Sequence, residues 1–576
     1  MNQPVDTSGL CRKYIVYNDH AKSDYFALIK ELVAKRNECP EDDGEYSAWQ
    51  TEIDRIYELV LDELKNNQGK PITPVKFGTS GWRGIIGKDV FRRSVSMVTE
   101  SIVQLYHEMS DSKELKDALG VKNLAEARER GAVVGHDNRF GGKVLAGCVT
   151  NVLTSNGFKI HYAGEATTGT LSAAVLELNA AFSVNLTPSH NPLQYGGFKY
   201  NAADAGPAAP VLTNRITANA QKFMSEDKPL DLTPNPSLVK SCDALKAWIS
   251  LVRKGCSAHG LDYDRIMADL AKADDVIVAV DCVHGASRIH IQSLFQKGAD
   301  EKLLLVRANE DPTFGGIAPE PSHANIKKVT EILKARPEKF KIGAIIDPDG
   351  DRIRFTDGVN DLSMNHFGAM AYHFLHETKK KKGMVAKTVA TSNFANGIAA
   401  TFGEEVFEPK VGFKEFKPVI DRALVCFEES DGITLIGHTP EKDAYIGLLA
   451  ALDMVLTLGM NLGDYRTEIE KVCGNYFPDR DGITVSAKGE ELKKILASLE
   501  KYKPGATIKV GDEDKPIAGV IDIDGRKMIL EDGSWLMIRP SGTEPKVRFY
   551  VEARTEAGKD ELFAAAKSML KEIGLL

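Results

Sequence analysis

The strongest constraint on the fold of this chain is a series of short apolar runs, each of which leads directly into a polar or glycine-containing loop. Such runs suit buried strands, and helical stretches of about 10–20 residues separate them, which together indicate an α/β fold. Ligands of parallel α/β sheets bind beyond the carboxyl ends of the strands. We therefore expect functional groups in the loops that follow the runs 132–134, 182–186, 276–280, 342–346, 385–390 and 424–427.

The length of the chain predicts several domains. At about 150 residues per domain, 576 residues correspond to about four domains. Proline-rich or polar segments at 227–237 and 476–481 are interpreted as linkers, and 355–362 is a further candidate. We place the domains at 1–225, 237–357, 358–475 and 480–576.

The two ends of the chain differ from its α/β part. Apolar residues recur at three- and four-residue steps over 47–66, and a similar pattern covers 21–36, so a helical preface is predicted before the first α/β domain. Near the C-terminus, strands are expected around 533–538 and 546–552, with a closing helix at 559–573. This pattern predicts a smaller α+β domain.

Composition excludes several classes of protein. Lys and Arg number 73 against 81 Asp and Glu, a net charge of −8, without the basic excess of a nucleic-acid binder. No apolar run approaches the ~20 residues of a membrane span, and the polar start lacks the core of a secretory signal. The eight cysteines form no C-x-x-C pair, which suits reduced thiols. We expect a cytoplasmic protein that binds neither nucleic acid nor membranes.

The loop after the run 182–186 offers a nucleophile. It reads T-P-S-H-N-P, so Pro188 and Pro192 restrict the backbone around Ser189 and are expected to leave its hydroxyl at a rigid, exposed strand end. The neighbouring His190 has a side chain that can bind a phosphoryl group or move a proton.

The loop D-P-D-G-D-R at 347–352, between predicted strands at 342–346 and 353–356, offers a metal site. Asp347, Asp349 and Asp351 alternate along a tight turn, and three carboxylates so placed suit a hard divalent cation. An EF-hand is excluded, because its sixth and twelfth positions would be Arg352 and Gly358 rather than Gly and Glu.

Two further loops offer binding groups. F-E-E-S-D-G at 427–432 combines carboxylates with a hydroxyl, a natural clamp for sugar hydroxyls. R-P-S-G-T-E-P at 539–545 combines an arginine, two hydroxyls and a glycine, the parts of a phosphate cradle. No G-x-x-x-x-G-K-[ST] nucleotide loop is present. The four loops together indicate an enzyme that acts on sugar phosphates.

These loops resemble, one by one, those of the α-D-phosphohexomutase family, the phosphoglucomutases and phosphomannomutases. The resemblance runs from about residue 77 to 552 and includes G-T-S-G-W-R-G at 78–84, G-G-F-K-Y-N at 196–201 and V-G-F-K at 411–414. It implies four domains around a central cleft: three related α/β domains and a C-terminal α+β domain.

The resemblance also implies a mechanism and a role for each loop. Ser189 is expected to carry a phosphoryl group, and Mg²⁺ is expected between that group and Asp347, Asp349 and Asp351. The substrates would be small sugar phosphates, with glucose 1,6-bisphosphate as intermediate and activator. By position, His190 and Lys199 resemble residues proposed for proton transfer, and Glu428 and Ser430 resemble the sugar clamp. The remaining candidates are basic residues expected to line the cleft (Arg83, Arg352 and Lys414), a lysine placed after the sugar loop (Lys442), and the distal phosphate loop (Arg539, Ser541, Gly542 and Thr543).

The choice of sugar is left open by departures from the family pattern. F-E-E-S-D-G lacks the usual initial Gly, and Ala444 stands where glycine is common, yet the E-E-S form favours a phosphoglucomutase. Phosphomannomutase and phosphopentomutase remain alternatives, as do a non-catalytic family member and a simple phosphatase. The oligomeric state, monomer or homodimer, is also open.

Overall fold

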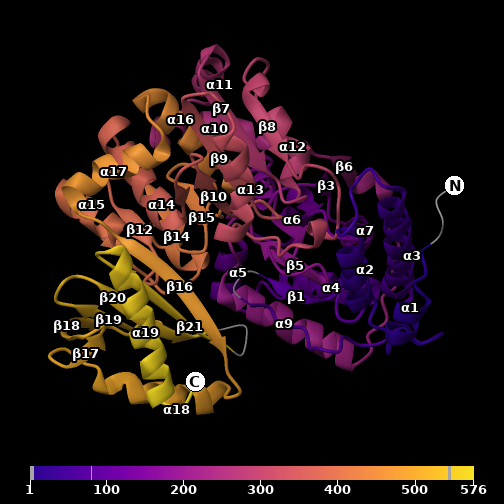
Figure 1. Cartoon of the computed structure of the whole chain (residues 1–576). Helices are drawn as coiled ribbons and strands as arrows, with labels where there is room; N and C mark the ends of the chain where they lie inside the picture. Colours follow the sequence, from indigo (N-terminus) through magenta and orange to yellow (C-terminus); the bar gives the residue numbers. More distant parts are fainter. Residues whose placement is uncertain (1–4, 79–80, 542–545) are drawn as a thin grey trace.

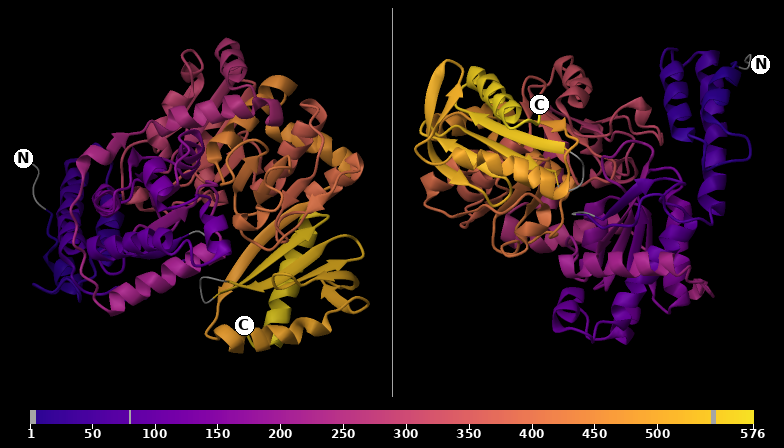
Figure 2. Two further views of the ribbon diagram at one scale, coloured as in Figure 1. Left: turned by 180° about the vertical axis from the view of Figure 1, so that it is seen from behind. Right: turned by 90° about the horizontal axis from the view of Figure 1, so that it is seen from below.

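The computed structural model describes residues 5–78, 81–541 and 546–576. Its strands form four separate sheets, one for each expected domain, and they follow one another along the chain (Figure 1). The N-terminal helices and the C-terminal domain lie at opposite ends of the molecule (Figures 1 and 2). The prediction of three α/β domains followed by an α+β domain is confirmed.

The first three sheets share one feature of topology. Each contains parallel strands and then an antiparallel hairpin: β4 (Phe182–Leu186) with β5 (Tyr195–Asn201), β9 (Phe340–Ile346) with β10 (Ile353–Thr356), and β14 (Val425–Glu428) with β15 (Gly432–Leu435). The three hairpin turns lie at the loops 187–192, 347–352 and 427–432, named here the serine loop, the aspartate loop and the sugar loop. Related topology therefore places one of the predicted loops at the same kind of turn in each of the first three domains.

The remaining strands complete these sheets. The first has the order β1-β5-β4-β2-β3-β6, with β1 (Trp82–Ile85), β2 (Ala132–His136), β3 (Ile160–Glu165) and β6 (Val239–Ser241). The second has the order β11-β10-β9-β7-β8, with β7 (Val276–Asp281), β8 (Leu303–Val306) and β11 (Asp361–Leu362). The third has the order β13-β12-β14-β15, with β12 (Val385–Lys387) and β13 (Val406–Phe407).

Two sheets extend past the expected domain boundaries. Strand β6 pairs with β3 although it lies beyond residue 225, and β11 pairs with β10 although it lies beyond residue 357. The segment 227–235 forms no helix or strand, but it leads back to the first sheet before the chain crosses to the second. The first two sheets therefore reach about residues 241 and 362.

The fourth sheet is antiparallel throughout, in the order β16-β21-β20-β19-β18-β17. Its strands are β16 (Phe477–Thr484), β17 (Thr507–Val510), β18 (Glu513–Ile521), β19 (Arg526–Leu530), β20 (Trp535–Pro540) and β21 (Lys546–Ala553), and α19 (Glu556–Glu572) packs on it. The expected linker at 476–481 is wrong: it is the start of β16, an edge strand. Edge strands tolerate the proline and charges that suggested a linker.

The predicted helical preface is confirmed. It consists of α1 (Ser8–Tyr14), α2 (Tyr25–Arg36) and α3 (Gly44–Asn66). The apolar faces of α2 and α3 are buried in the core of the first domain, beside residues such as Val75 and Trp82. The preface is therefore part of that domain.

Among the described helices, no single one is long and apolar enough to cross a membrane. One pair bent by 77°, Ala444–Leu458 with Leu462–Cys473, passes the test of length and composition together.

Candidate active site

Ser189 is held in an unusual backbone conformation at the end of β4. Its φ is +58°, and only 1% of the residue is exposed. The expectation of an exposed hydroxyl is wrong, because the aspartate loop of the second domain packs against it. The Ser189 N–H donates to Thr187 Oγ1 at 2.9 Å, and Thr187 Oγ1 donates to Asp137 Oδ2 at 2.6 Å. The Ser189 hydroxyl donates to Asp347 Oδ2 at 3.0 Å. The serine of the first domain thus faces the aspartate loop of the second.

The three aspartates of the β9–β10 turn form one buried cluster. Their exposed fractions are 0–1%, and one carboxylate oxygen from each lies within 4.8 Å of the others. Asp347 Oδ1 accepts the N–H groups of Asp351 and Arg352 at 3.0 and 3.1 Å, which fixes the turn. Asp349 Oδ1 and Asp351 Oδ1 are buried and accept no hydrogen bond. Unsatisfied carboxylate oxygens of this kind fit a divalent cation.

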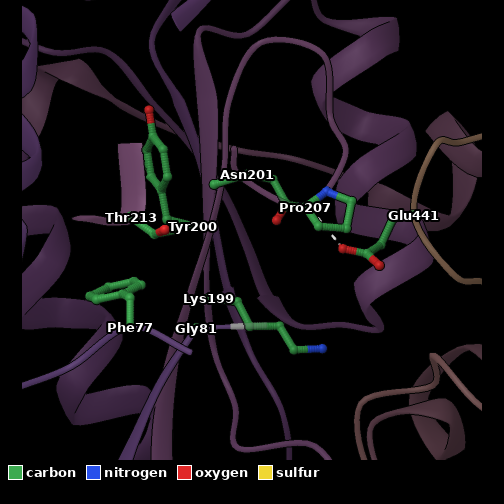
Figure 3. Close-up of a pocket in the computed structure, with 9 residues that line it drawn as sticks. Phe77, Gly81, Lys199, Tyr200, Asn201, Pro207, Thr213 and Glu441 are labelled. Atoms are coloured by element: carbon green, nitrogen blue, oxygen red, sulfur yellow. Dashed lines mark hydrogen bonds between the residues drawn. The ribbon is translucent and has the colours of Figure 1, made fainter. Parts of the chain in front are cut away.

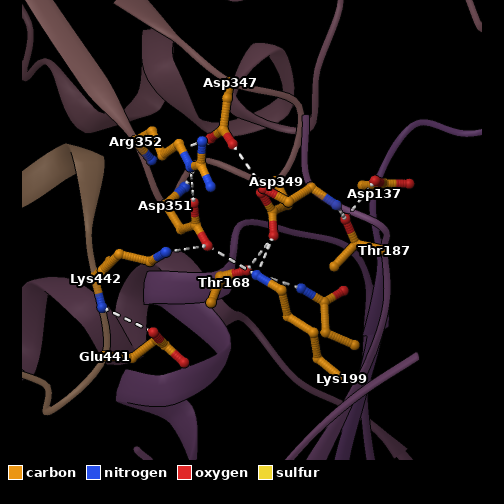
Figure 4. Close-up of polar contacts among 12 residues, drawn as sticks. Asp137, Thr168, Thr187, Lys199, Asp347, Asp349, Asp351, Arg352, Glu441 and Lys442 are labelled. Carbon is orange, nitrogen blue, oxygen red and sulfur yellow. Dashed lines mark hydrogen bonds and ion pairs between the residues drawn. The ribbon is translucent and has the colours of Figure 1, made fainter. Parts of the chain in front are cut away.

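Lys199, on β5, offsets part of the negative charge of the three aspartates (Figure 4). Its Nζ lies 2.6 Å from Asp349 Oδ2 and 2.8 Å from Asp351 Oδ2. Burial alone would lower the pKa of Lys199, but the two carboxylates outweigh it and raise that pKa above its usual value. Lys199 is therefore a cation at neutral pH.

The three carboxylates of the cluster still repel one another. Burial, then the neighbouring Asp349 and Asp351 carboxylates, raise the pKa of Asp347 well above its usual range. Burial also opposes ionisation of Asp351, but Lys199, Lys442 and Arg352 hold its pKa below the usual value. A bound dication would stabilise all three carboxylates in their charged form.

His190 lies beside the serine hydroxyl, with its Nδ1 3.4 Å from Ser189 Oγ. Burial lowers the pKa of His190 well below its usual value, and the cations Arg352 and Arg83 lower it further. The imidazole is therefore neutral at pH 7 and has a lone pair that can accept a proton. Arg83 comes from β1, opposite Gly197 of β5.

The third domain contributes Glu428 and Lys442. Glu428 ends β14, and Lys442 Nζ lies 3.4 Å from its Oε1 and 3.5 Å from Asp351 Oδ2. Burial would lower the pKa of Lys442, but Asp351 and Glu428 raise it. Ser430 lies in the turn after Glu428, half-buried. The sugar loop and the aspartate loop are therefore bridged by one lysine.

A small pocket adjoins Lys199 on β5 and is lined by residues such as Phe77, Tyr200 and Glu441 (Figure 3). Asn201 Nδ2 donates to Glu441 Oε2 at 3.3 Å, so β5 contacts the third domain directly. The pocket shares Lys199 with the aspartate cluster and is part of the same site.

Two predicted groups lie apart from the cluster. Lys414 is half-buried on a short 3₁₀ helix, Phe413–Phe416, and within the described ranges it pairs with neither Ser189 nor the aspartates. Arg539 is the penultimate residue of β20, with its Nε 3.2 Å from Asp524 Oδ2. The Ser541 N–H donates to the Lys546 carbonyl at 2.8 Å. The other two phosphate-loop candidates, Gly542 and Thr543, lie outside the described residues.

Some site residues were not found from the sequence. Thr168 Oγ1 donates to Asp349 Oδ2 at 2.9 Å, and Asp137 supports Thr187. Asp137 directly follows β2, whose run 132–134 was identified although no residue of its loop was named. Thr168 lies shortly after β3, which was not predicted as a strand.

Comparisons with known proteins agree with this architecture. Models of the phosphoglucomutase/phosphomannomutase family match the chain in order: alpha/beta/alpha domain I at 74–227, domain II at 260–360, domain III at 363–472 and the C-terminal domain at 485–567. A phosphoglucomutase/phosphomannomutase of Thermococcus kodakarensis is 27% identical over 527 residues, covering 86% of this chain and 98% of that protein. Phosphoglucomutase 1 of Drosophila melanogaster is 26% identical over 558 residues, covering 88% and 94%.

A solved structure shows the same fold. The phosphoglucomutase pp63/parafusin from Paramecium, in its open form, superposes with a TM-score of 0.66 at 21% identity and covers 88% of this chain and 96% of its own. The chain thus belongs to the phosphoglucomutase/phosphomannomutase family, the α-D-phosphohexomutases. It is an isomerase of the phosphotransferase type, a phosphohexomutase.

Proposed function

We propose that this chain is a Mg²⁺-dependent phosphoglucomutase that interconverts glucose 1-phosphate and glucose 6-phosphate. The reaction passes through phosphorylated Ser189 and glucose 1,6-bisphosphate. The observation that carries the proposal is the 3.0 Å contact from Ser189 Oγ to Asp347, which places a rigid hydroxyl at the edge of three buried carboxylates. Phosphoryl transfer depends chiefly on positioning and charge neutralisation.

The protein's residues then act as follows. Ser189 carries the phosphoryl group; a sugar hydroxyl attacks the phosphorus, the bond to Ser189 Oγ breaks, and the new bond joins phosphorus to the sugar oxygen. The neutral His190 accepts the proton of the sugar hydroxyl. The protonated Lys199 stabilises the negative charge that develops on Ser189 Oγ as its bond to phosphorus breaks. Asp347, Asp349 and Asp351 would hold Mg²⁺, which when bound neutralises charge on the phosphoryl oxygens.

The bisphosphate then turns round and returns its other phosphate to Ser189. Binding in both orientations needs a clamp for the sugar hydroxyls, for which we propose Glu428 and Ser430. The Lys442 contact at 3.4 Å supports a fixed orientation of the Glu428 carboxylate. Arg83, Arg352 and Lys414 would bind phosphate along the path, and Arg539, Ser541, Gly542 and Thr543 would hold the phosphate that is not reacting.

The preference for glucose rests on the E-E-S sequence of the sugar loop, with phosphomannomutase and phosphopentomutase as the alternatives. The test is kcat/KM for glucose, mannose, glucosamine and ribose 1-phosphates with the same enzyme. The proposal expects the highest value for glucose 1-phosphate. A higher value for any of the other three sugars would overturn it.

Two rival functions are separated by one time course. A simple phosphatase would release inorganic phosphate faster than it isomerises the sugar phosphate, and a non-catalytic member would do neither.

We also propose a reducing compartment such as the cytoplasm, which the eight unpaired cysteines support.

We further propose that glucose 1,6-bisphosphate activates the enzyme. Added in catalytic amounts, it should restore the activity of dephosphorylated enzyme.

Replacing Arg539 with Ala is expected to raise KM for both glucose 1-phosphate and glucose 6-phosphate, because one anchor must serve both orientations. Losing a charge-assisted phosphate contact costs about 1.5–3 kcal/mol, or roughly 10- to 150-fold. Steady-state kinetics in both directions measure this, with Arg539→Lys as a control that keeps the charge. A defect in one direction alone would contradict a shared anchor.

A further inference from the structure

One arginine ties down the backbone of the serine loop. Arg139, buried just after β2, directs its guanidinium at four backbone carbonyls of that loop. Nη2 donates to the carbonyls of Ser189, at 2.7 Å, and Asn191, while Nη1 donates to those of Pro192, at 2.8 Å, and Tyr195, at 3.3 Å. A single side chain therefore binds four backbone carbonyls between Ser189 and Tyr195.

The loop needs such a restraint. Ser189 is a non-glycine residue at φ +58°, a conformation that persists only where the surroundings hold it. Its own N–H donates to Thr187 Oγ1, and Thr187 Oγ1 donates in turn to Asp137. Arg139 Nε lies 3.5 Å from the same Asp137 carboxylate. Asp137 therefore contacts both Thr187 and Arg139, the two residues whose side chains bind the backbone of the serine loop.

The second domain covers one face of the Arg139 guanidinium, whose edge donates the hydrogen bonds to the serine loop. The ring of Phe314 lies 4.9 Å from the guanidinium carbon of Arg139, within reach of a cation–π contact. Phe314 is fully buried at φ +56°, in the turn 311–316. Asp311 shapes this turn by accepting the N–H groups of Thr313 at 2.8 Å and Gly315 at 3.0 Å.

The helical preface holds that turn. Arg36 at the end of α2 lies 3.6 Å from Asp311 Oδ2, and Asn37 Nδ2 donates to the Gly315 carbonyl at 2.9 Å. On α3, the ring of Tyr57 packs against that of Phe140, the neighbour of Arg139, with centroids 4.3 Å apart. The preface thus contacts the surroundings of Arg139 from two sides.

We propose that Arg139 is a positioning residue for the phosphoryl-bearing serine loop, and that the preface and the turn 311–316 form a brace that fixes Arg139. This inference rests on the proposed function for its kinetic readout. It gives the preface a role in catalysis, reached through Phe314 and Arg139 without contact with the substrate.

Arg139→Lys tests the positioning role, because lysine keeps the charge but cannot reach four carbonyls from one planar fork. We expect kcat to fall by about 10²-fold, the effect of misplacing a reacting group by about 1 Å, with KM within about twofold. The matched control is Arg130→Lys, which removes a guanidinium that donates to the carbonyls of Gly120, Asn179 and Ala180, away from the serine loop. The control should lose stability while kcat stays unchanged; equal changes in kcat for both variants would overturn the proposal.

Phe314→Leu and Asn37→Ala test the brace, and Asn37 is exposed, so its replacement leaves the core intact. We expect kcat to fall by about tenfold for Phe314→Leu, and by less for Asn37→Ala, at unchanged KM. Amide hydrogen exchange of 187–195 should be faster by about tenfold in Phe314→Leu. Wild-type exchange and wild-type kcat in both variants would overturn the brace even if Arg139→Lys fails to fold. An inactive wild-type enzyme would reject the proposed function instead, and the exchange rates alone would then decide the brace.

Discussion

Ser189→Ala is expected to lose at least about three orders of magnitude in mutase kcat, since about 4 kcal/mol or more of nucleophilic assistance disappears. The residue is 1% exposed and its hydroxyl donates to Asp347, so the variant lacks the hydroxyl that faces the aspartate cluster. Because a free alkoxide is unfavourable at neutral pH, the resting enzyme should already carry the phosphoryl group. Mass spectrometry of the wild type should find a fraction with one added phosphoryl group, mapped to Ser189.

The control for this variant is Ser225→Ala, a serine exposed at the end of a helix of the first domain. It should keep both turnover and the phosphorylated fraction. Near-normal turnover by Ser189→Ala, or a phosphoryl group trapped on Asp347, would show that this is not a phosphoserine mutase.

The strand-end loops were predictable because burial of a parallel strand requires an apolar run, and the chain must then turn at the sheet edge. The run 182–186 is β4, residue for residue, and the run at 342–346 is the buried part of β9. Their hairpin turns bring Ser189 and the aspartates together, so local pattern and topology agree here. The resemblance of the loops to the family supplied the roles that spacing alone could not.

The run 385–390 shows where an apolar pattern misleads. Only Val385–Lys387 is a strand, β12. Val389 and Ala390 are apolar because they pack against Trp535, Met537 and Tyr550 of the fourth domain. A short apolar run therefore does not distinguish a buried strand from a segment that packs against another domain.

The support for the site could not be predicted from local sequence. Asn37 and Gly315 are in contact although 278 residues separate them, and nothing in the preface itself identifies that partner. Arg139 binds backbone carbonyls, which every residue has, so the sequence does not indicate which residues it contacts. Contacts of these kinds require the three-dimensional structure.

Asp349→Ala is expected to nearly abolish activity, by at least about 10²–10³-fold, while the fold stays intact. Asp349 supplies one buried oxygen without a hydrogen bond and is central to the only group of metal-ligating side chains found among the described residues. Its removal takes one of the three candidate carboxylate ligands from the cluster and should weaken Mg²⁺ binding. Turnover at saturating Mg²⁺, with circular dichroism as the check on folding, measures the effect.

A second readout separates metal binding from catalysis. A cation that binds only the folded protein raises its thermal stability in proportion to the logarithm of its concentration, so added Mg²⁺ should raise the Tm of the wild type and leave that of Asp349→Ala unchanged.

Asp357→Asn is the matched control, because Asp357 is also buried but accepts N–H groups from Val359 and Asn360 instead of facing the cluster. It should lower Tm yet keep the response to Mg²⁺. Full activity in Asp349→Ala, or in wild type after exhaustive chelation, would refute the metal assignment.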